Sequence, residues 1–254
     1  MTVGGLRRTQ EAGAFGGNVA DDPGRAKIAA ARYAVERYVR PGQRIALGTG
    51  STATEAVRAL ALRFPKAPFE CVASSRATEE LARSLGIPVR PLEGVDRFQL
   101  MLDGADEVSP ALDLTKGGGG ALFREKLLAR LSDDLVILVD PSKLVRALGE
   151  RHRIPVEVVP FARPVVSHAL ERRGYRAELR TGPDGRPFRT DNGNEILDLT
   201  PPRPIENPSE EERALSELTG IVETGLFVGL ARRVVVGYPD GHVEELPRSP
   251  VPPT

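Results

Sequence analysis

Hydrophobic and polar positions follow two rhythms along the chain up to about residue 150. Short apolar runs predict buried strands, and apolar residues three or four positions apart predict helices. The predicted helices are 26–39, 54–64, 77–85 and 121–131, and the predicted strands are 44–47, 69–73, 98–102 and 135–139. Because strands alternate with helices, we expect a Rossmann-like α/β fold, a mostly parallel sheet with helices on both faces.

The composition changes near Arg151, and the pattern that follows predicts a smaller α+β lobe of the ferredoxin-like type. Its predicted elements are an extended segment at 155–160, helices at 164–173 and 208–218, and strands at 177–180 and 195–199. The last predicted strands, 222–227, 234–238 and 243–246, could belong to either lobe. We expect a disordered tail (1–24), an α/β domain (25–152 with about 222–247), a smaller domain (153–221) and a loose tail (248–254).

Composition narrows the classes of partner. The 254 residues contain 35 basic and 35 acidic side chains, so no basic face for nucleic acid is expected. The lone Cys71 excludes an internal disulfide and fits a reducing cytoplasm. The start lacks the apolar segment of a secretory signal, and the longest aliphatic run, 135–139, is too short to span a membrane. We therefore expect a cytoplasmic protein.

The segment GTGSTA at 48–53 follows a predicted strand and opens a helix. Its backbone N–H groups, with the hydroxyls of Ser51 and Thr52, could hold a phosphate. The lysine of a Walker loop is absent, and Ala53 replaces the third glycine of a dinucleotide fingerprint. The competing interpretation is that Thr52 only caps a helix.

The segment DGADEV at 103–108 places Asp103, Asp106 and Glu107 at the end of an apolar strand. Such carboxylates can bind a metal, bind sugar hydroxyls or transfer protons, but the segment could also be an acidic turn. A transition-metal site is not expected, because the three histidines stand apart and Cys71 has no partner.

Four consecutive glycines follow Lys116 in KGGGGALFREK at 116–126. Glycine is costly to order, so the run favours close approach of the backbone to a small ligand, with N–H groups for a developing oxyanion. Ordinary loop flexibility is the alternative, and Glu125 and Lys126 could be solvated helix charges. Lys143, past another strand end, could reach the same cleft or be an exposed lysine without a role. Together these residues suit proton transfer on a small phosphorylated metabolite.

These segments resemble the signature segments of type A ribose-5-phosphate isomerases. The likeness continues through SSRATEELARSLGIPV, VDPSK, PVEVVPFAR, TDNGNEILD and GIVETGLFVG, in order, and covers most of residues 25–246. It implies interconversion of D-ribose 5-phosphate and D-ribulose 5-phosphate through an enediolate in the non-oxidative pentose phosphate pathway, without a metal or organic cofactor. It also implies a homodimer or homotetramer.

The resemblance assigns roles residue by residue. Glu125 would be the base, Lys116 and the glycine N–H groups would stabilise the oxyanion, and Asp103 would bind sugar hydroxyls and assist ring opening. The residues that would bind substrate are Thr49, Gly50, Ser51, Thr52, Asp103, Gly104, Ala105, Asp106, Lys116, Gly117, Gly118, Gly119 and Lys143. Lys27 is a further candidate for the phosphate. Lys116 and the helix N-terminus should keep Glu125 ionised and weaken it as a base, unless burial offsets them.

Two other functions compete with the isomerase. Sugar-phosphate-sensing regulators place a related domain behind a DNA-binding head, but about 24 residues before the first helix are too few for that head. Intact Lys116 and Glu125 also favour catalysis over sensing. Amino-sugar-phosphate deaminases and acyl-CoA transferases on a related fold are the second alternative.

Overall fold

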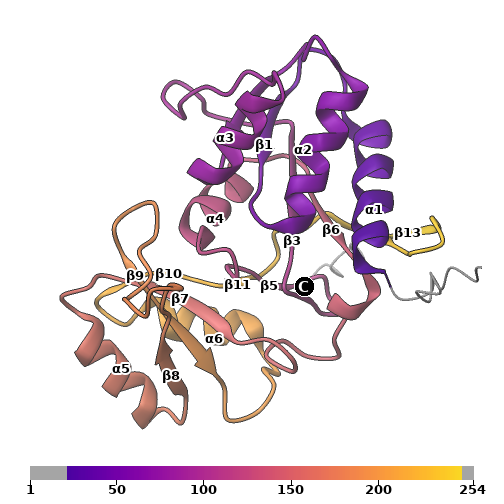
Figure 1. Ribbon diagram of the computed structural model, residues 1–254. Coiled ribbons are helices and arrows are strands. Elements are labelled where there is room, and N and C mark those ends of the chain that lie inside the picture. The colour runs from indigo at the N-terminus through magenta and orange to yellow at the C-terminus, as the bar shows by residue number, and fades with distance from the viewer. Residues whose placement is uncertain (1–21, 248–254) are drawn as a thin grey trace, which may run out of the picture.

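The computed structural model describes residues 22–247 and has two lobes (Figure 1). The two predicted tails therefore lie outside the described residues, apart from residues 22–24. These residues start the first helix, α1 (Pro23–Tyr38), earlier than predicted. The Asp22 side chain accepts the N–H of Gly24 at 2.9 Å, and Pro23 occupies a first-turn position where its missing N–H costs nothing.

The large lobe is built on a six-stranded sheet, and the predicted α/β class is confirmed. All neighbouring strands are parallel except the antiparallel pair at one edge. In order across the sheet the strands are β13 (Val243–Pro247), β12 (Arg233–Gly237), β6 (Leu135–Val139), β3 (Leu100–Gly104), β1 (Arg44–Leu47) and β2 (Glu70–Ala73).

Both faces of this sheet are buried because successive strand residues point to opposite sides. Leu100 and Leu102 join one apolar core with α1 and α2 (Ser51–Arg63), whereas Met101 joins the other. That second core contains Leu128 of α4 (Leu122–Arg130). The continuous apolar character of these strands follows from this double coverage.

The predicted helices of the large lobe are all present, with shifted ends. α2 starts three residues before the predicted residue 54, and α3 (Arg76–Ser84) is capped by the Ser75 side chain, which accepts the N–H of Thr78 at 3.1 Å. β3 spans Leu100–Gly104, two residues later at each end than the predicted strand 98–102. Asp103 therefore lies within the strand and not after it. No helix within residues 22–247 is long and apolar enough to cross a bilayer.

The small lobe has the order βαββαβ of a ferredoxin-like fold. Its four strands form an antiparallel sheet with a separate apolar core. The elements in chain order are β7 (Ile154–Val158), α5 (Arg163–Arg172), β8 (Arg176–Leu179), β9 (Glu195–Thr200), α6 (Pro208–Ser216) and β10 (Ile221–Thr224).

The predicted single strand over 222–227 is wrong. β10 pairs with β7 of the small lobe, whereas β11 (Leu226–Phe227) pairs with β5 (Leu114–Thr115), which also pairs with β4 (Glu107–Val108). Gly225 separates β10 from β11, and an added Cβ there would lie 2.5 Å from the carbonyl oxygen of Lys116. We therefore propose the boundary between the lobes at about residue 225 rather than 222.

Candidate active site

The predicted polar segments meet at one edge of the large sheet. β1, β3 and β6 are parallel neighbours, so the loops that follow them emerge on the same side. Asp103, the second-to-last residue of β3, is fully buried there, and its Oδ1 accepts the N–H groups of Gly104 at 2.8 Å and Thr49 at 3.2 Å. A Cβ on Gly48 would lie 1.9 Å from the same oxygen. The glycine thus lets the first loop close over the aspartate.

The first loop leaves the start of α2 without a side-chain cap. Gly50 is the N-cap, with φ of 109°, and Thr52 lies inside the helix, so the interpretation of Thr52 as a cap is wrong. The first N–H groups of an α-helix lack intrahelical partners and favour an anion. Lys27 of α1 adds an ammonium group 3.0 Å from Ser51 Oγ. This end of the site suits a phosphate.

Three hydroxyl residues behind the first loop were not predicted as part of the site. Thr49 Oγ1 lies 2.7 Å from Ser74 Oγ and 2.9 Å from Ser75 Oγ, and Thr78 Oγ1 donates to the carbonyl of Gly48 at 2.9 Å. The Thr49 hydroxyl therefore anchors the loop to α3 and does not point into open space. The run Ser74-Ser75 after a strand was the available sequence signal.

The glycine run is a tight turn that other side chains approach closely. Gly120 N–H donates to the carbonyl of Gly117 at 3.0 Å, and both residues have positive φ values, of 81° and 101°. A Cβ on Gly118 would lie 2.8 Å from Asp106 Oδ1, and the Gly118 N–H donates to Asp106 Oδ2 at 2.9 Å. Protein side chains therefore approach this turn closely, and its close approach to a small ligand stays a prediction.

Lys116 connects the two carboxylates of the site. Its Nζ lies 2.9 Å from Asp103 Oδ2 and 3.2 Å from Glu125 Oε1, and it donates to the carbonyl of Gly104 at 2.7 Å. All three side chains are at most 3% exposed. Glu125 Oε2 is buried and has no hydrogen-bond partner among the described residues. The site therefore contains one ammonium group, two carboxylates and one free carboxylate oxygen.

Burial controls the protonation of this group. It raises the pKa of Glu125 to about 8, and the negative charges of Asp103 and Asp106 add to the rise while Lys116 opposes it. Burial also raises the pKa of Asp103, against the opposing effect of Lys116 and two N–H groups. Burial disfavours the charged form of Lys116, but its two carboxylate neighbours raise its pKa above the ordinary value. Burial thus overcomes the lysine and makes Glu125 a stronger base than its sequence neighbours alone predict.

The interpretation of Glu125 and Lys126 as solvated charges is wrong, because both are buried. Lys126 faces the small lobe and lies 2.9 Å from Glu212 Oε1, 2.7 Å from Glu223 Oε1 and 3.1 Å from Thr224 Oγ1. We call Lys126 and these three partners the Lys126 cluster. It fixes α4 against α6 and β10, so that Glu125 on the same helix turns toward Lys116.

A pocket of about 100 Å³ brings the predicted residues together. Asp103 lies beneath the pocket and is not on its wall. Lys143, from the turn after β6, reaches the wall, and its Nζ lies 3.5 Å from His152 Nε2. The residues that line the pocket are Lys27, Thr49, Gly50, Ser51, Thr52, Gly104, Ala105, Asp106, Lys116, Gly117, Gly118, Gly119, Glu125 and Lys143.

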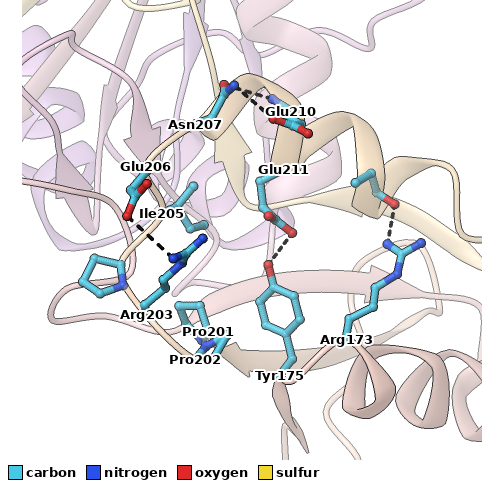
Figure 2. A pocket seen from close by; sticks show the side chains of 12 residues that line it. Arg173, Tyr175, Pro201, Pro202, Arg203, Ile205, Glu206, Asn207, Glu210 and Glu211 are labelled. Carbon is cyan, nitrogen blue, oxygen red and sulfur yellow. Dashed lines mark hydrogen bonds and ion pairs between the residues drawn. The ribbon is translucent and has the colours of Figure 1, made fainter.

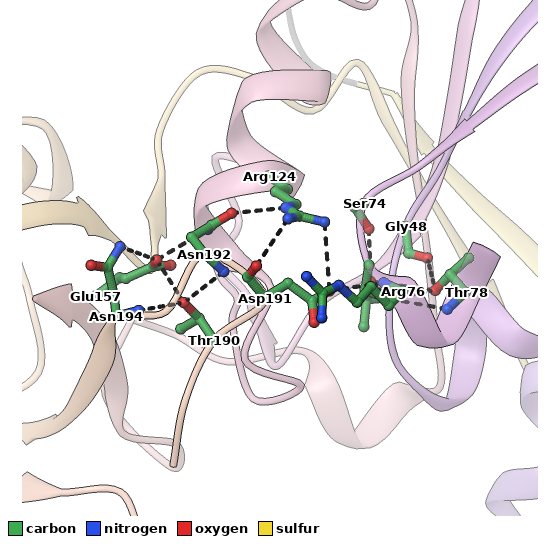
Figure 3. Close-up of polar contacts among 12 residues, drawn as sticks. Gly48, Ser74, Arg76, Thr78, Arg124, Glu157, Thr190, Asp191, Asn192 and Asn194 are labelled. Atoms are coloured by element: carbon green, nitrogen blue, oxygen red, sulfur yellow. Dashed lines mark hydrogen bonds and ion pairs between the residues drawn. The ribbon is translucent and has the colours of Figure 1, made fainter. Parts of the chain in front are cut away.

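The small lobe holds this edge of the large lobe through the loop between β8 and β9 (Figure 3). Asp191 Oδ2 accepts the N–H of Arg76 at 2.8 Å, and Arg124, beside Glu125, donates to Asn192 Oδ1 at 2.9 Å. Glu157 of β7 organises the loop by accepting from three of its side chains. They are Thr190, Asn192 and Asn194, at 3.0, 3.1 and 2.8 Å.

A larger pocket of about 490 Å³ lies between α6 and the segment 201–207 of the small lobe (Figure 2). Its polar groups are already paired: Tyr175 donates to Glu211, and Arg173 donates to the Ala214 carbonyl. It contains none of the predicted site residues. Within residues 22–247, no three His, Cys, Asp or Glu side chains are grouped to hold a metal ion. We therefore place the candidate active site in the pocket around Lys116 and Glu125.

Comparison with known proteins gives one consistent result. The family model described as ribose 5-phosphate isomerase A (phosphoriboisomerase A) matches residues 70–241. A ribose-5-phosphate isomerase A from Chloroflexus aurantiacus is 46% identical over 216 residues, which cover 84% of this chain and 90% of the relative. One from Thermomicrobium roseum is 48% identical over 219 residues, covering 85% and 92%.

Solved structures agree with this result. A D-ribose-5-phosphate isomerase in complex with phospho-erythronic acid superposes with a TM-score of 0.86 at 34% identity, covering 90% of this chain and 100% of the other. A ribose 5-phosphate isomerase A from Methanocaldococcus jannaschii gives a TM-score of 0.81 at 38% identity, covering 87% and 97%.

Proposed function

The chain belongs to the ribose 5-phosphate isomerase A family, and we propose that it interconverts D-ribose 5-phosphate and D-ribulose 5-phosphate with Glu125 as the base. The observation that carries this assignment is the unpartnered Oε2 of Glu125, a buried carboxylate oxygen on a residue that lines the pocket. Substrate can meet this oxygen without first displacing a protein hydrogen bond. The reaction is an aldose–ketose isomerisation of the non-oxidative pentose phosphate pathway.

The chemical step moves one proton between neighbouring carbons. The Glu125 carboxylate takes the proton from C2 of the open-chain aldose, the C1–C2 double bond forms, and the carbonyl oxygen O1 becomes an oxyanion. Lys116 and those N–H groups of the glycine turn that have no protein partner within residues 22–247 stabilise that charge. Glu125 then returns the proton to C1, while the O2 proton passes to O1 and leaves the C2 ketone.

The basicity of Glu125 matches this task. A base works best when its pKa lies near the operating pH, and burial raises the pKa of Glu125 to about 8. Lys116 remains charged next to it, because its own pKa is raised by the same carboxylates. The pair therefore offers a strong base and a permanent cation to the two ends of the enediolate.

The phosphate and hydroxyl groups have separate places in the proposal. The open N-terminus of α2, with Lys27 and Lys143 on the pocket wall, would bind the phosphate. Asp106, also on the wall, would accept sugar hydroxyls. Asp103 is fully buried beside Lys116. We therefore propose that Asp103 orients Lys116, in place of the direct contact with sugar hydroxyls that the sequence predicted.

The proposal also covers the setting of the enzyme. We place it in the cytoplasm, where the buried free thiol of Cys71 is compatible with reducing conditions. We propose a homodimer or homotetramer and a reaction without metal or organic cofactor. Size-exclusion chromatography with light scattering measures the oligomeric state.

The decisive experiment is conversion of ribose 5-phosphate to ribulose 5-phosphate, with and without a chelator, by wild type and Glu125→Gln. We expect chelator-resistant turnover in wild type and a loss of about 10³-fold in the folded variant, the range of a general base. Glu223→Gln is the matched control, because it changes a carboxylate that pairs with the buried Lys126 and not with Lys116. This variant should keep most of the activity. Full activity of Glu125→Gln would contradict the assigned base. A wild type that binds sugar phosphate without turnover would be a sensor instead.

A further inference from the structure

Two carbonyl groups of the glycine turn are bound by one side chain of the small lobe. Arg180, the residue after β8, donates from Nη1 to the carbonyl oxygens of Gly117 at 2.9 Å and Gly118 at 3.1 Å. The proposed mechanism uses the opposite side of the same turn, where the N–H groups lie. A residue from the other lobe therefore contacts the back of the predicted oxyanion site.

The guanidinium of Arg180 is held from two further directions. Arg180 donates from Nε to Asp198 Oδ2 of β9 at 2.9 Å and from Nη2 to Asp198 Oδ1. Both side chains are only 16% exposed. The Phe188 ring lies 5.9 Å from the guanidinium carbon and presses on the end of the turn, where a Cβ on Gly120 would be 2.5 Å from it. Bidentate pairing fixes the plane of a guanidinium group, so the remaining Nη1 donors of Arg180 are held in one orientation toward the glycine turn.

Peptide geometry transmits this orientation to the pocket. In a trans peptide the C=O of one residue and the N–H of the next point in opposite directions, and residues 22–247 contain no cis peptide. Holding the Gly117 carbonyl directs the Gly118 N–H to Asp106 on the pocket wall, as its 2.9 Å bond shows. Holding the Gly118 carbonyl likewise turns the Gly119 N–H away from Arg180. That N–H has no protein partner within residues 22–247.

We propose that Arg180 is a positioning residue for the oxyanion site, acting through the peptides of the glycine turn without touching substrate. The free N–H of Gly119 is the donor that it aims at the developing enediolate oxygen. This inference rests on the proposed isomerase function. It adds to that function a specific task for the small lobe, which supplies no residue to the wall of the pocket.

The test compares Arg180→Gln with Arg176→Gln, an exposed arginine at the start of β8 that pairs with Glu178. Preorganised oxyanion donors act in the transition state, so we expect Arg180→Gln to lose about 10- to 100-fold in kcat while KM for ribose 5-phosphate stays within about threefold. Affinity for inorganic phosphate should also be unchanged. Arg176→Gln should match wild type in each measurement.

Chemical rescue separates positioning from general stability. In Arg180→Ala, added guanidinium ion at concentrations far below denaturation should restore part of kcat, because it can occupy the vacated place between Asp198 and the turn. Unchanged kcat in a folded Arg180→Gln variant would overturn the inference. Loss in KM alone, an equal loss in Arg176→Gln, or no rescue would also overturn it. A wild type without turnover would contradict the proposed function and this inference with it.

Discussion

Within residues 22–247, two buried lysines lie on either side of the glycine turn, and the carboxylates around them differ in exposure. Lys116 and Lys126 both lie over the Phe227 ring, with Nζ 5.4 and 5.0 Å from its centroid. Each also contacts two carboxylates and one oxygen of another kind. The difference lies in the carboxylates. Those of Lys116 are at most 3% exposed, whereas Glu212 and Glu223 of the Lys126 cluster are 19% and 14% exposed.

Exposure of the partners therefore separates the proposed reactive site from the Lys126 cluster. The Lys126 carboxylates keep contact with water, and the cluster joins the two lobes as a clamp. The Lys116 carboxylates have lost that contact, and one ammonium group cannot neutralise both. Burial raises the pKa of Glu125, the negative charge of Asp103 adds to the rise, and one oxygen of Glu125 has no hydrogen-bond partner among the described residues. We infer that burial of these carboxylates, which Lys116 offsets only in part, is what makes Glu125 suitable as the proposed base.

Removing the lysine of the reactive site should have the largest effect. We expect Lys116→Met to reduce kcat by about 10³-fold or more, because the enediolate loses its cation and Glu125 keeps its proton. Initial rates on ribose 5-phosphate measure the loss, and circular dichroism checks the fold. A folded Lys116→Met variant within tenfold of wild type would remove the distinction between the two lysines.

The same substitution at the second lysine should act on stability. Lys126→Met leaves Glu212 and Glu223 facing each other at the contact between the lobes, and we expect a loss of about 3 kcal/mol in the free energy of unfolding. Urea denaturation followed by circular dichroism measures it. At temperatures where the variant is folded, kcat should stay within about tenfold of wild type. A loss of activity as large as that of Lys116→Met would show that the clamp is part of the reactive site.

Glu125 should make the protein less stable as the pH rises. Its pKa is raised from 4.5 to about 8, so its contribution to stability is complete below pH 4.5 and is lost as the pH rises through about 8. Glu125→Gln cannot ionise, and we expect it to exceed wild type in stability at pH 8–9 by on the order of a few kcal/mol. Thermal unfolding at pH 5, 7 and 9 measures the difference, with Glu223→Gln as control. A gain of equal size at every pH would contradict this origin.

The smallest expected change is a shift of the pH profile in Asp103→Asn. Because the Asp103 charge raises the pKa of Glu125, its removal should lower that pKa and move the acid limb of kcat/KM to lower pH. A shift of roughly one pH unit is expected, in addition to reduced turnover from a less firmly held Lys116. Initial rates between pH 5.5 and 9.5 test it, with surface Asp133→Asn as control. An unshifted or alkaline-shifted limb would contradict the coupling.

The sequence predicted those parts of the candidate site that are formed by the backbone of the motifs themselves. GTGSTA, DGADEV and the glycine run predicted the loops of the pocket, because strand ends and glycine turns are local features. The side-chain environment was harder to predict. Glu125 and Lys126 look like ordinary helix charges because the groups that bury Lys126, in residues 212–224, are distant in sequence.

Asp103 and Arg180 show the same limit in different ways. The motif placed Asp103 near the substrate, but only the contact between Gly48 and its carboxylate shows that it lies beneath the pocket wall. Arg180 had no local signal, since it follows an unremarkable strand of the other lobe. Its relation to the glycine turn arises from the packing of the lobes, which a single sequence does not encode in any short pattern.

The path of the chain between the lobes also matters during synthesis. β6 is made first, then the whole small lobe, and only afterwards β12, which pairs with β6 in the finished sheet. The small lobe can therefore fold on the ribosome while the large sheet still has an open strand edge, and such an edge can pair with other chains. While residues 140–232 are made, the β6 edge that β12 later covers is thus one place where the nascent chain can pair with other chains.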